Sequence, residues 1–360
     1  MSEKLEPLGE YLMKGVVFKG NRNLELIDFP DPTPGPREVI IEVKASGICG
    51  SDLHFYRNAD ALAAFGYSDA TEPIIGGHEP SGVIVSRGKD VNESLVPIGA
   101  RVMNYHYLGC GHCNDCRSGW QQLCPSGFKI YGATAHGAHA QYMVMSAETI
   151  VALPDELTFS EGAAISCGTG TAFQALKRLN LTARDTLAVF GLGPVGASVA
   201  LLAKSMGAHV IGVDISAERL KFCKKLGVDE IVNPIDDDSV AILKDLTRGK
   251  GVDLAVDCTG VPEARLQAVQ TTRTWGTVCF LGEGGKITLD VSKDINRKQL
   301  TLIGSWTFSS FGQMECARYI ADRSINLSQI FTDYYTLDEA KVAYEKFDTG
   351  SLVGKGVFEF

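Results

Sequence analysis

One short apolar strand that leads into a glycine-rich turn and then a helix constrains this chain more than any other feature. The strand is TLAVF at 186–190, and the helix is predicted over 194–206. The turn between them has the pattern G-x-G-x-x-G and consists of Gly191, Leu192, Gly193, Pro194, Val195 and Gly196. The first glycine allows a tight turn, the second lets a pyrophosphate approach the backbone, and the third lets the helix pack on the strand. The turn therefore predicts a dinucleotide-binding βαβ unit, with the pyrophosphate at the helix N-terminus.

Strands and helices alternate from about residue 160 onward. Helices are predicted near 237–247 and 262–271, and apolar runs that fit buried strands recur at 209–214, 253–258, 277–282 and 300–305. This alternation predicts an α/β fold with a doubly wound parallel sheet that helices cover on both faces. Ligands bind at the carboxyl ends of such strands, which would place Cys258 and Gly282 at the cofactor crevice.

An acidic residue ends the second strand of the predicted unit. Asp214 lies 18 residues after Gly196, where a carboxylate would accept hydrogen bonds from the adenosine ribose and repel a 2′-phosphate. This spacing favours NAD over NADP, although Arg219, one helical turn further on, could weaken the preference. The alternative is an ordinary βαβ turn with a surface aspartate.

Charge and composition exclude several classes of protein. The chain has 34 Lys and Arg against 43 Asp and Glu, a net charge of −9, whereas a nucleic-acid binder should carry a basic surface. No apolar run approaches the roughly 20 residues of a membrane span. The first ten residues lack the apolar core of a signal peptide, so we expect a cytoplasmic protein without membrane or nucleic-acid partners.

Four of the ten cysteines lie close together in the sequence. In a reducing compartment, metal ligation explains such a cluster better than disulfides do. Four thiolates saturate a tetrahedral zinc ion, which predicts a structural site formed by Cys110, Cys113, Cys116 and Cys124. An iron–sulfur cluster or free surface thiols are the alternatives.

Three further residues have the chemistry of an open metal site. Cys49, His78 and Cys167 match the ligand set of a catalytic zinc whose fourth position is left for water or substrate. The spacing does not show that the three meet in space. An isolated Cys or His is more often a core residue.

The motifs, taken in their order, resemble the zinc-dependent medium-chain alcohol and polyol dehydrogenases over essentially the whole chain. They are GICGSDLH at 47–54, GHE at 77–79, the four-cysteine loop, SCGTGTA at 166–172 and GLGPVG at 191–196. The resemblance implies a GroES-like, mainly β catalytic domain and a Rossmann NAD-binding domain. The implied limits are 1–166 for the catalytic domain, with a structural zinc lobe at 106–125 and completion by 305–360, and 167–304 for the Rossmann domain.

The same resemblance implies roles for single residues. It makes Cys49, His78 and Cys167 the catalytic zinc ligands and the four clustered cysteines the structural ones. Ser51 matches the hydroxyl of a proton relay, and His54 matches its outer end. Glu79 matches the acidic residue beside the metal, and Asp52 matches a carboxylate that orients His78.

The implied activity is hydride transfer between the carbinol carbon of an alcohol, polyol or sugar and NAD, with two zinc ions per chain. The implied assembly is a homo-oligomer, with a tetramer favoured over a dimer. The alternative is an NADPH-dependent aldehyde or ketone reductase on the same scaffold. Three departures from the usual polyol pattern leave the substrate open: Cys167 where many members have Glu, Gln141 where many have an acidic residue, and a lengthened loop at 59–70.

Overall fold

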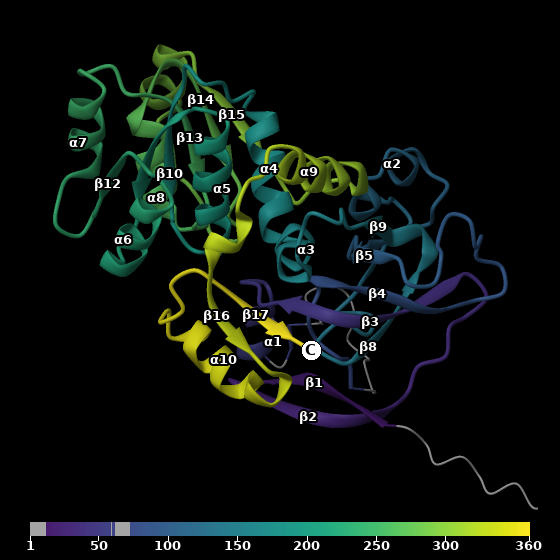
Figure 1. Cartoon of the computed structure of the whole chain (residues 1–360). Helices are drawn as coiled ribbons and strands as arrows, with labels where there is room; N and C mark the ends of the chain where they lie inside the picture. The colour runs from purple at the N-terminus through teal and green to yellow at the C-terminus, as the bar shows by residue number, and fades with distance from the viewer. Residues whose placement is uncertain (1–11, 59, 62–72) are drawn as a thin grey trace, which may run out of the picture. The chain divides into compact units, whose positions relative to one another are not determined.

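The computed structural model describes residues 12–58, 60–61 and 73–360 (Figure 1). The chain divides into two compact units. The first unit contains the chain up to Ala163 together with Tyr335–Asp348 and Val357–Phe360, and the second contains Ala164–Tyr334 and Thr349–Gly356. The C-terminal part of the chain thus contributes to both units. The lengthened loop predicted at 59–70 lies almost entirely outside the described residues.

An antiparallel sheet forms the centre of the first unit. Its strands follow the order β17-β3-β4-β5-β9, and β8 also pairs with β3. The strands are β3 (Glu38–Gly47), β4 (Pro80–Arg87), β5 (Arg101–Asn104), β8 (Tyr142–Ser146), β9 (Ile150–Ala152) and β17 (Lys355–Glu359). Val39, Ile41 and Val43 of β3 pack in one core with Ile84 and Val102. These β-branched side chains suit a pleated surface that is buried on one face.

A hairpin and two helices pack together beside this sheet (Figure 1). The hairpin consists of β1 (Leu12–Gly20) and β2 (Asn23–Pro30), and the helices are α1 (Asp52–Arg57) and α10 (Ala340–Asp348). Asp348 binds Arg22 of the hairpin turn at 2.7 Å and also pairs with Arg57. The last helix of the chain is thereby held against α1, although nearly 300 residues separate them.

The other elements of the first unit are short. They are β6 (Tyr107–Leu108), α2 (Asn114–Arg117), β7 (Lys129–Ile130), α3 (Phe159–Ile165), and three 3-10 turns at Gln121–Leu123, Ala147–Thr149 and Leu337–Glu339. The segment around α2 has little regular structure, and it is the segment that holds the four clustered cysteines.

A parallel sheet with the order β12-β11-β10-β13-β14-β15 forms the centre of the second unit. The strands are β10 (Thr186–Phe190), β11 (His209–Val213), β12 (Glu230–Val232), β13 (Val252–Asp257), β14 (Thr272–Phe280) and β15 (Thr301–Gly304). The order reverses at β10, as in a doubly wound dinucleotide-binding sheet. The predicted α/β class is therefore confirmed for this unit.

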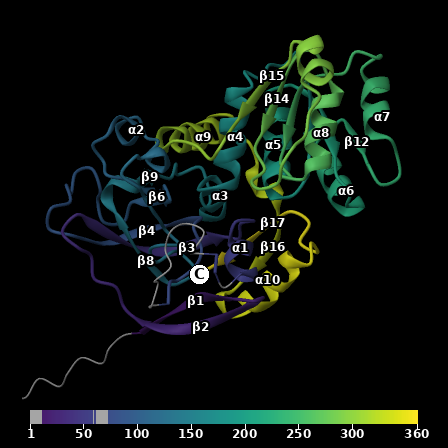
Figure 2. The same cartoon turned by 180° about the vertical axis from the view of Figure 1, so that it is seen from behind.

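Helices cover both faces of the parallel sheet. They are α4 (Gly168–Arg178), α5 (Pro194–Ser205), α6 (Ala217–Lys225), α7 (Ser239–Leu246), α8 (Pro262–Thr271) and α9 (Ser310–Asp322). Helices α5 and α8 connect strands in opposite directions along the sheet, so right-handed crossovers place them on opposite faces. Figure 2 shows the same arrangement from behind, with α6 and α7 near β12. A π-helical turn (Val291–Ile295), 3-10 turns at Asn296–Lys298 and Leu327–Ile330, and β16 (Phe331–Tyr335) complete the chain.

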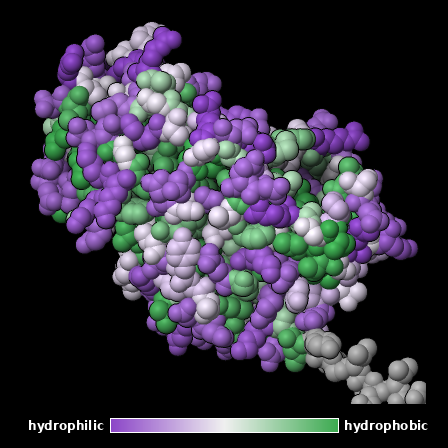
Figure 3. Space-filling view, viewed as in Figure 1, coloured by the Kyte–Doolittle hydropathy of each residue, from purple (hydrophilic) through white to green (hydrophobic). Residues whose placement is uncertain are grey.

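Hydrophilic side chains cover much of the face drawn in Figure 3, with separate apolar patches between them. Among the residues that the structure describes, no helix has both the length and the apolar character needed to cross a membrane.

Two glycines of the predicted turn are sterically required. Gly191 has φ +86°, a left-handed conformation that glycine adopts without strain. A Cβ on Gly196 would stand 1.8 Å from the carbonyl oxygen of Gly191, so this helix can start so close to β10 only without a side chain.

We expect Gly196→Ala to destabilise the second unit, because the added methyl group must displace backbone. Overpacking of this kind costs about 1–3 kcal/mol, or several degrees in melting temperature. Thermal unfolding followed by circular dichroism measures it. The matched control is Gly304→Ala, whose Cβ would meet nothing within 4 Å. Equal melting temperatures for the two variants would contradict the packing argument.

Candidate metal centres and dinucleotide turn

The four clustered cysteines converge in the first unit. Their sulfur atoms all lie within 4.8 Å of one another. Cys110 Sγ is 3.9 Å from Cys116 Sγ, and Cys113 Sγ is 3.9 Å from Cys124 Sγ. Backbone N–H groups of Cys110, Cys113 and Cys116 each donate to a cysteine sulfur at 3.4 Å. The loop is thus wound around a sulfur cage.

This cage fits a tetrahedral zinc ion. Zn–S bonds of about 2.3 Å place the sulfur atoms of a tetrahedron about 3.8 Å apart, close to the separations found. Backbone N–H groups of His112 and Cys113 lower the pKa of the Cys110 thiol to about 6, whereas burial raises the pKa of Cys116 to about 12. A bound cation would hold both as thiolates, because metal coordination deprotonates a thiol.

A second group of possible ligands forms where β3 ends and β4 begins. Ser46 and Pro80 are paired across these two antiparallel strands. Cys49 follows β3, while His78 and Glu79 precede β4, so the strand pairing itself brings them together. Their ligand atoms all lie within 4.8 Å of one another, and the three residues are buried.

Residues at the start of α1 orient this group. Asp52 Oδ2 accepts a hydrogen bond from the Cys49 backbone N–H at 2.9 Å, and Asp52 Oδ1 lies 2.9 Å from His78 Nδ1. Ser51 Oγ donates to Cys49 Sγ at 3.3 Å and lies 3.2 Å from His78 Nε2. The carboxylate therefore faces Nδ1, which leaves Nε2 on the side of the sulfur and the serine hydroxyl.

The electrostatics of this group suit a cation. Burial alone lowers the pKa of His78, but the charges and hydrogen bonds of Asp52 and Cys49 outweigh burial and raise the pKa well above its ordinary value. Surroundings that stabilise an extra positive charge on the imidazole would equally stabilise a divalent ion beside it. With a thiolate, an imidazole and a nearby carboxylate, the donors fit zinc.

The other residues predicted for this site differ in exposure. Glu79 is fully buried, and a Cβ on Gly47 would lie 1.9 Å from Glu79 Oε2, so a side chain at position 47 would require the Glu79 carboxylate to move. His54 is exposed on α1, as the outer end of a relay would be.

The buried His106 was not among the predicted site residues, although its ring lies 5.0 Å from that of His78. Its position, four residues before Cys110, was the only sequence signal.

Cys167 belongs to the second unit. It is buried and occupies the N-cap position of α4, four residues beyond Ala163, where the first unit ends. Its role as a third ligand remains a prediction.

The predicted dinucleotide turn forms between β10 and α5. Gly193 is the N-cap residue of α5 and Pro194 is in its first turn. Asp214 Oδ2 accepts from the Leu192 backbone N–H at 2.6 Å, and Asp214 Oδ1 accepts from the Ser216 N–H at 2.8 Å. The carboxylate thus holds the turn against the end of β11.

Three other predicted cofactor residues lie around this turn. Cys258 N–H donates to Phe190 O at 2.8 Å and Gly282 N–H donates to Asp257 O at 2.9 Å, so both follow strand ends at the same sheet edge. Arg219 donates to Leu352 O at 3.3 Å, and its Nη1 would be 4.0 Å from a Cβ on Gly193. Desolvation raises the pKa of the Cys258 thiol well above its ordinary value, which disfavours the thiolate form.

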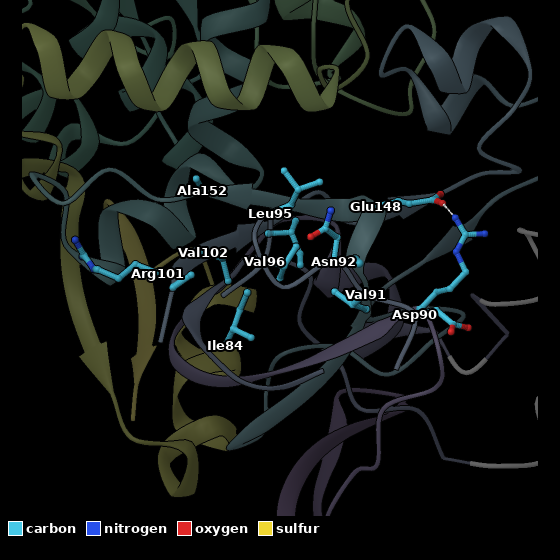
Figure 4. Close-up of a pocket in the computed structure, with 14 residues that line it drawn as sticks. Ile84, Asp90, Val91, Asn92, Leu95, Val96, Arg101, Val102, Glu148 and Ala152 are labelled. Atoms are coloured by element: carbon cyan, nitrogen blue, oxygen red, sulfur yellow. Dashed lines mark hydrogen bonds and ion pairs between the residues drawn. The ribbon is translucent and has the colours of Figure 1, made fainter. Parts of the chain in front are cut away.

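A cavity of about 460 Å³ opens elsewhere in the first unit (Figure 4). Aliphatic side chains such as Ile84, Val96 and Val102 line it, together with the ion-paired Arg37 and Glu148. None of the predicted site residues lines this cavity.

Comparison with known proteins matches both parts of the chain. Residues 35–155 match the family described as alcohol dehydrogenase GroES-like domain, and residues 194–322 match that described as zinc-binding dehydrogenase. The predicted fold class, a GroES-like domain with a Rossmann sheet, is therefore confirmed.

Whole-chain relatives agree with these matches. The uncharacterized zinc-type alcohol dehydrogenase-like protein YphC of Escherichia coli K12 is 39% identical over 97% of this chain and 99% of its own. Sorbitol dehydrogenase of Bacillus subtilis 168 is 31% identical over 93% of each chain. A putative zinc-binding dehydrogenase from Sinorhizobium meliloti 1021, solved bound to NADP, has a TM-score of 0.83 at 26% identity and covers 98% of this chain and 100% of its own. The chain therefore belongs to the zinc-type alcohol dehydrogenases of the medium-chain dehydrogenase/reductase family.

Proposed function

We propose that this protein is a zinc- and NAD-dependent dehydrogenase that reversibly oxidises the CH–OH group of an alcohol, polyol or sugar. One observation carries the proposal: Ser51 Oγ lies within 3.3 Å of both Cys49 Sγ and His78 Nε2, while Asp52 occupies the other face of the imidazole. A proton-accepting hydroxyl beside two metal-ligand atoms is the arrangement that alcohol oxidation needs.

Cys49 Sγ, His78 Nε2 and Cys167 Sγ are the proposed ligands of the catalytic zinc, with Glu79 beside them. Cys167 is four residues along the chain from the unit that holds the other two, and a second thiolate completes an open three-ligand set. When bound, zinc supplies a Lewis acid that lowers the pKa of an alcohol hydroxyl, and the nicotinamide accepts a hydride. The four-cysteine loop is the proposed structural site.

Ser51 and His54 are the proposed route for the substrate proton. Ser51 Oγ would accept the proton from the substrate hydroxyl and release its own hydroxyl proton towards His54, because it is already at hydrogen-bonding distance from the proposed ligand atoms. His54, exposed on the next helical turn, would pass the proton to solvent. Asp52 would orient His78 from the opposite side.

The turn at Gly191, Gly193, Pro194, Val195 and Gly196 is the proposed pyrophosphate site, with Cys258 and Gly282 on the same sheet edge. Asp214 favours NAD because its negative charge would repel a 2′-phosphate. The NADP-bound relative and the nearby Arg219 keep the NADPH-dependent carbonyl reductase as the second candidate.

The proposal retains several further predictions. The domain limits, with 1–166 and 305–360 forming the catalytic domain around 167–304, remain predictions. A homo-oligomer and a cytoplasmic location remain predictions as well. Curated relatives named sorbitol dehydrogenase and D-arabitol-phosphate dehydrogenase favour a polyhydroxylated substrate.

A substrate panel tests the activity. Diols, polyols, sugars and simple alcohols are each incubated with NAD and with NADP, and the reduced cofactor is followed by its absorbance. We expect turnover with at least one polyhydroxylated alcohol and NAD. Ser51→Ala should lower that turnover about 10²–10⁴-fold, since a positioned proton acceptor contributes this much. An unchanged rate in Ser51→Ala would remove the relay, and no activity across the panel in zinc-loaded protein would remove the proposed reaction.

Metal content tests the two zinc sites. We expect the parent protein to carry about two zinc ions per chain and Cys49→Ala and Cys113→Ala to carry about one each, because each removes a ligand from a different site. Elemental analysis after gel filtration measures the ratio. The control is Cys223→Ala, a buried cysteine outside both groups, which should keep both ions. A parent protein with one ion or none would contradict the proposal.

Cofactor preference tests Asp214. We expect Asp214→Asn to lower the ratio of kcat/KM for NAD to that for NADP at least tenfold, since the substitution removes the charge but keeps an acceptor for the Leu192 N–H. Asp237→Asn, an exposed aspartate of the same unit, is the control. If both variants keep the parent ratio, Asp214 does not select the cofactor.

A further inference from the structure

Two polar side chains with no part in the proposed chemistry are buried in the first unit. His139, just before β8, and Tyr344, in α10, are fully buried. Aromatic rings surround them: Phe18 lies 4.9 Å from Tyr344 and Phe358 lies 4.8 Å from His139 between ring centroids, both edge to face. Polar groups in such apolar surroundings are costly unless they are hydrogen-bonded.

Their hydrogen bonds form one series that ends at Asp52, whose other oxygen forms an ion-pair contact with the proposed zinc ligand His78. Ser46 Oγ is 2.8 Å from His139 Nδ1, and His139 Nε2 is 2.7 Å from the Tyr344 hydroxyl. The Tyr344 hydroxyl donates to Asp52 Oδ2 at 3.0 Å, and Asp52 Oδ1 lies 2.9 Å from His78 Nδ1. Five side chains from four separate parts of the sequence are thus connected.

Tyr344 determines which group donates and which accepts in each hydrogen bond of this series. Tyr344 has one hydroxyl proton and gives it to Asp52, so its oxygen accepts from His139, which must carry a proton on Nε2. A neutral His139 then accepts from Ser46 at Nδ1. Burial and the nearby charge of Asp52 raise the pKa of Tyr344 well above its ordinary value, so the phenol keeps its proton.

We propose that Tyr344 and His139 are positioning residues that hold Asp52 in place, so that His78 keeps its proton on Nδ1 and presents Nε2 to the catalytic zinc. This inference rests on the proposed function. Asp52 receives two donors on Oδ2, one from the Cys49 backbone and one from Tyr344, which leaves Oδ1 directed at His78. Carboxylates that orient a histidine ligand in this way raise metal affinity.

The backbone beside His78 is built to accept the His139 ring. Gly77 has φ +84°, and a Cβ there would lie 2.3 Å from His139 Nδ1. The His139 N–H donates to Gly76 O at 3.0 Å, so the imidazole is fixed against the segment that carries the ligand. The ring position is therefore determined by the same segment that it supports.

Tyr344→Phe tests the proposal because it removes only the hydroxyl. Zinc-loaded parent and variant are titrated with a chelator, and the zinc retained per chain is measured. We expect the affinity of the more labile ion to fall about tenfold in Tyr344→Phe, within the range found for residues that orient metal ligands. The structural ion should be retained equally in both proteins.

Tyr131→Phe is the matched control, a buried tyrosine of the same unit whose hydroxyl accepts from the Ser146 N–H at 2.8 Å. It should change melting temperature but not zinc affinity. If Tyr344→Phe retains zinc as the parent does, the positioning role is refuted. A parent protein without a second zinc ion would instead refute the proposed function.

A second pair of variants covers the case in which Tyr344→Phe does not fold. His139→Gln keeps an N–H donor for Tyr344, and His139→Leu does not. We expect zinc affinity close to that of the parent in His139→Gln and a several-fold loss in His139→Leu. Equal zinc affinities in the two variants would overturn the proposal, because His139 would then only fill space and its N–H donor would not matter.

Discussion

The carboxylate of Asp52 is the group on which the arrangement of the first unit's site depends. It is fully buried, and a buried charge is tolerated only when its oxygens are occupied by donors or opposite charge. Its neighbours come from the β3–α1 turn, the start of β4 and the helix α10. One buried carboxylate thus contacts three segments that the sequence separates by up to about 290 residues, and its oxygens are satisfied only where those segments are packed together.

Local patterns predicted most of the second unit. The predicted strand at 186–190 and the helix predicted near 262–271 have the bounds that the structure shows, because the strand is an apolar run that ends before Gly191 and the helix begins at Pro262. The start of β14 was harder to predict from the sequence. The strand begins at Thr272, five residues before the predicted 277, because a bulged stretch around Trp275 lengthens it. The exposed Trp275 has φ +63°, which no local pattern indicates.

The site was predictable where its members share a motif and not where they meet only through the fold. Cys49, Ser51 and Asp52 lie in one stretch of sequence, and His78 and Glu79 in another, so the family resemblance could name both groups as candidates. His139 and Tyr344 are 205 residues apart, and each is an ordinary residue in its own segment. Only the packing of α10 against α1, held by Asp348 with Arg22 and Arg57, brings Tyr344 to Asp52.

Glycine explains how such charged and polar groups approach the backbone so closely. At Gly47, Gly77 and Gly109, a Cβ would lie 1.9 Å from Glu79, 2.3 Å from His139 and 2.6 Å from Cys116, respectively. In each case the absent side chain is replaced by a functional group of a site or of its support. The glycines beside the site motifs are therefore part of the site's geometry, because the neighbouring carboxylate, imidazole or thiol occupies the space that a side chain would fill. A methyl group at any of the three would require that group to move.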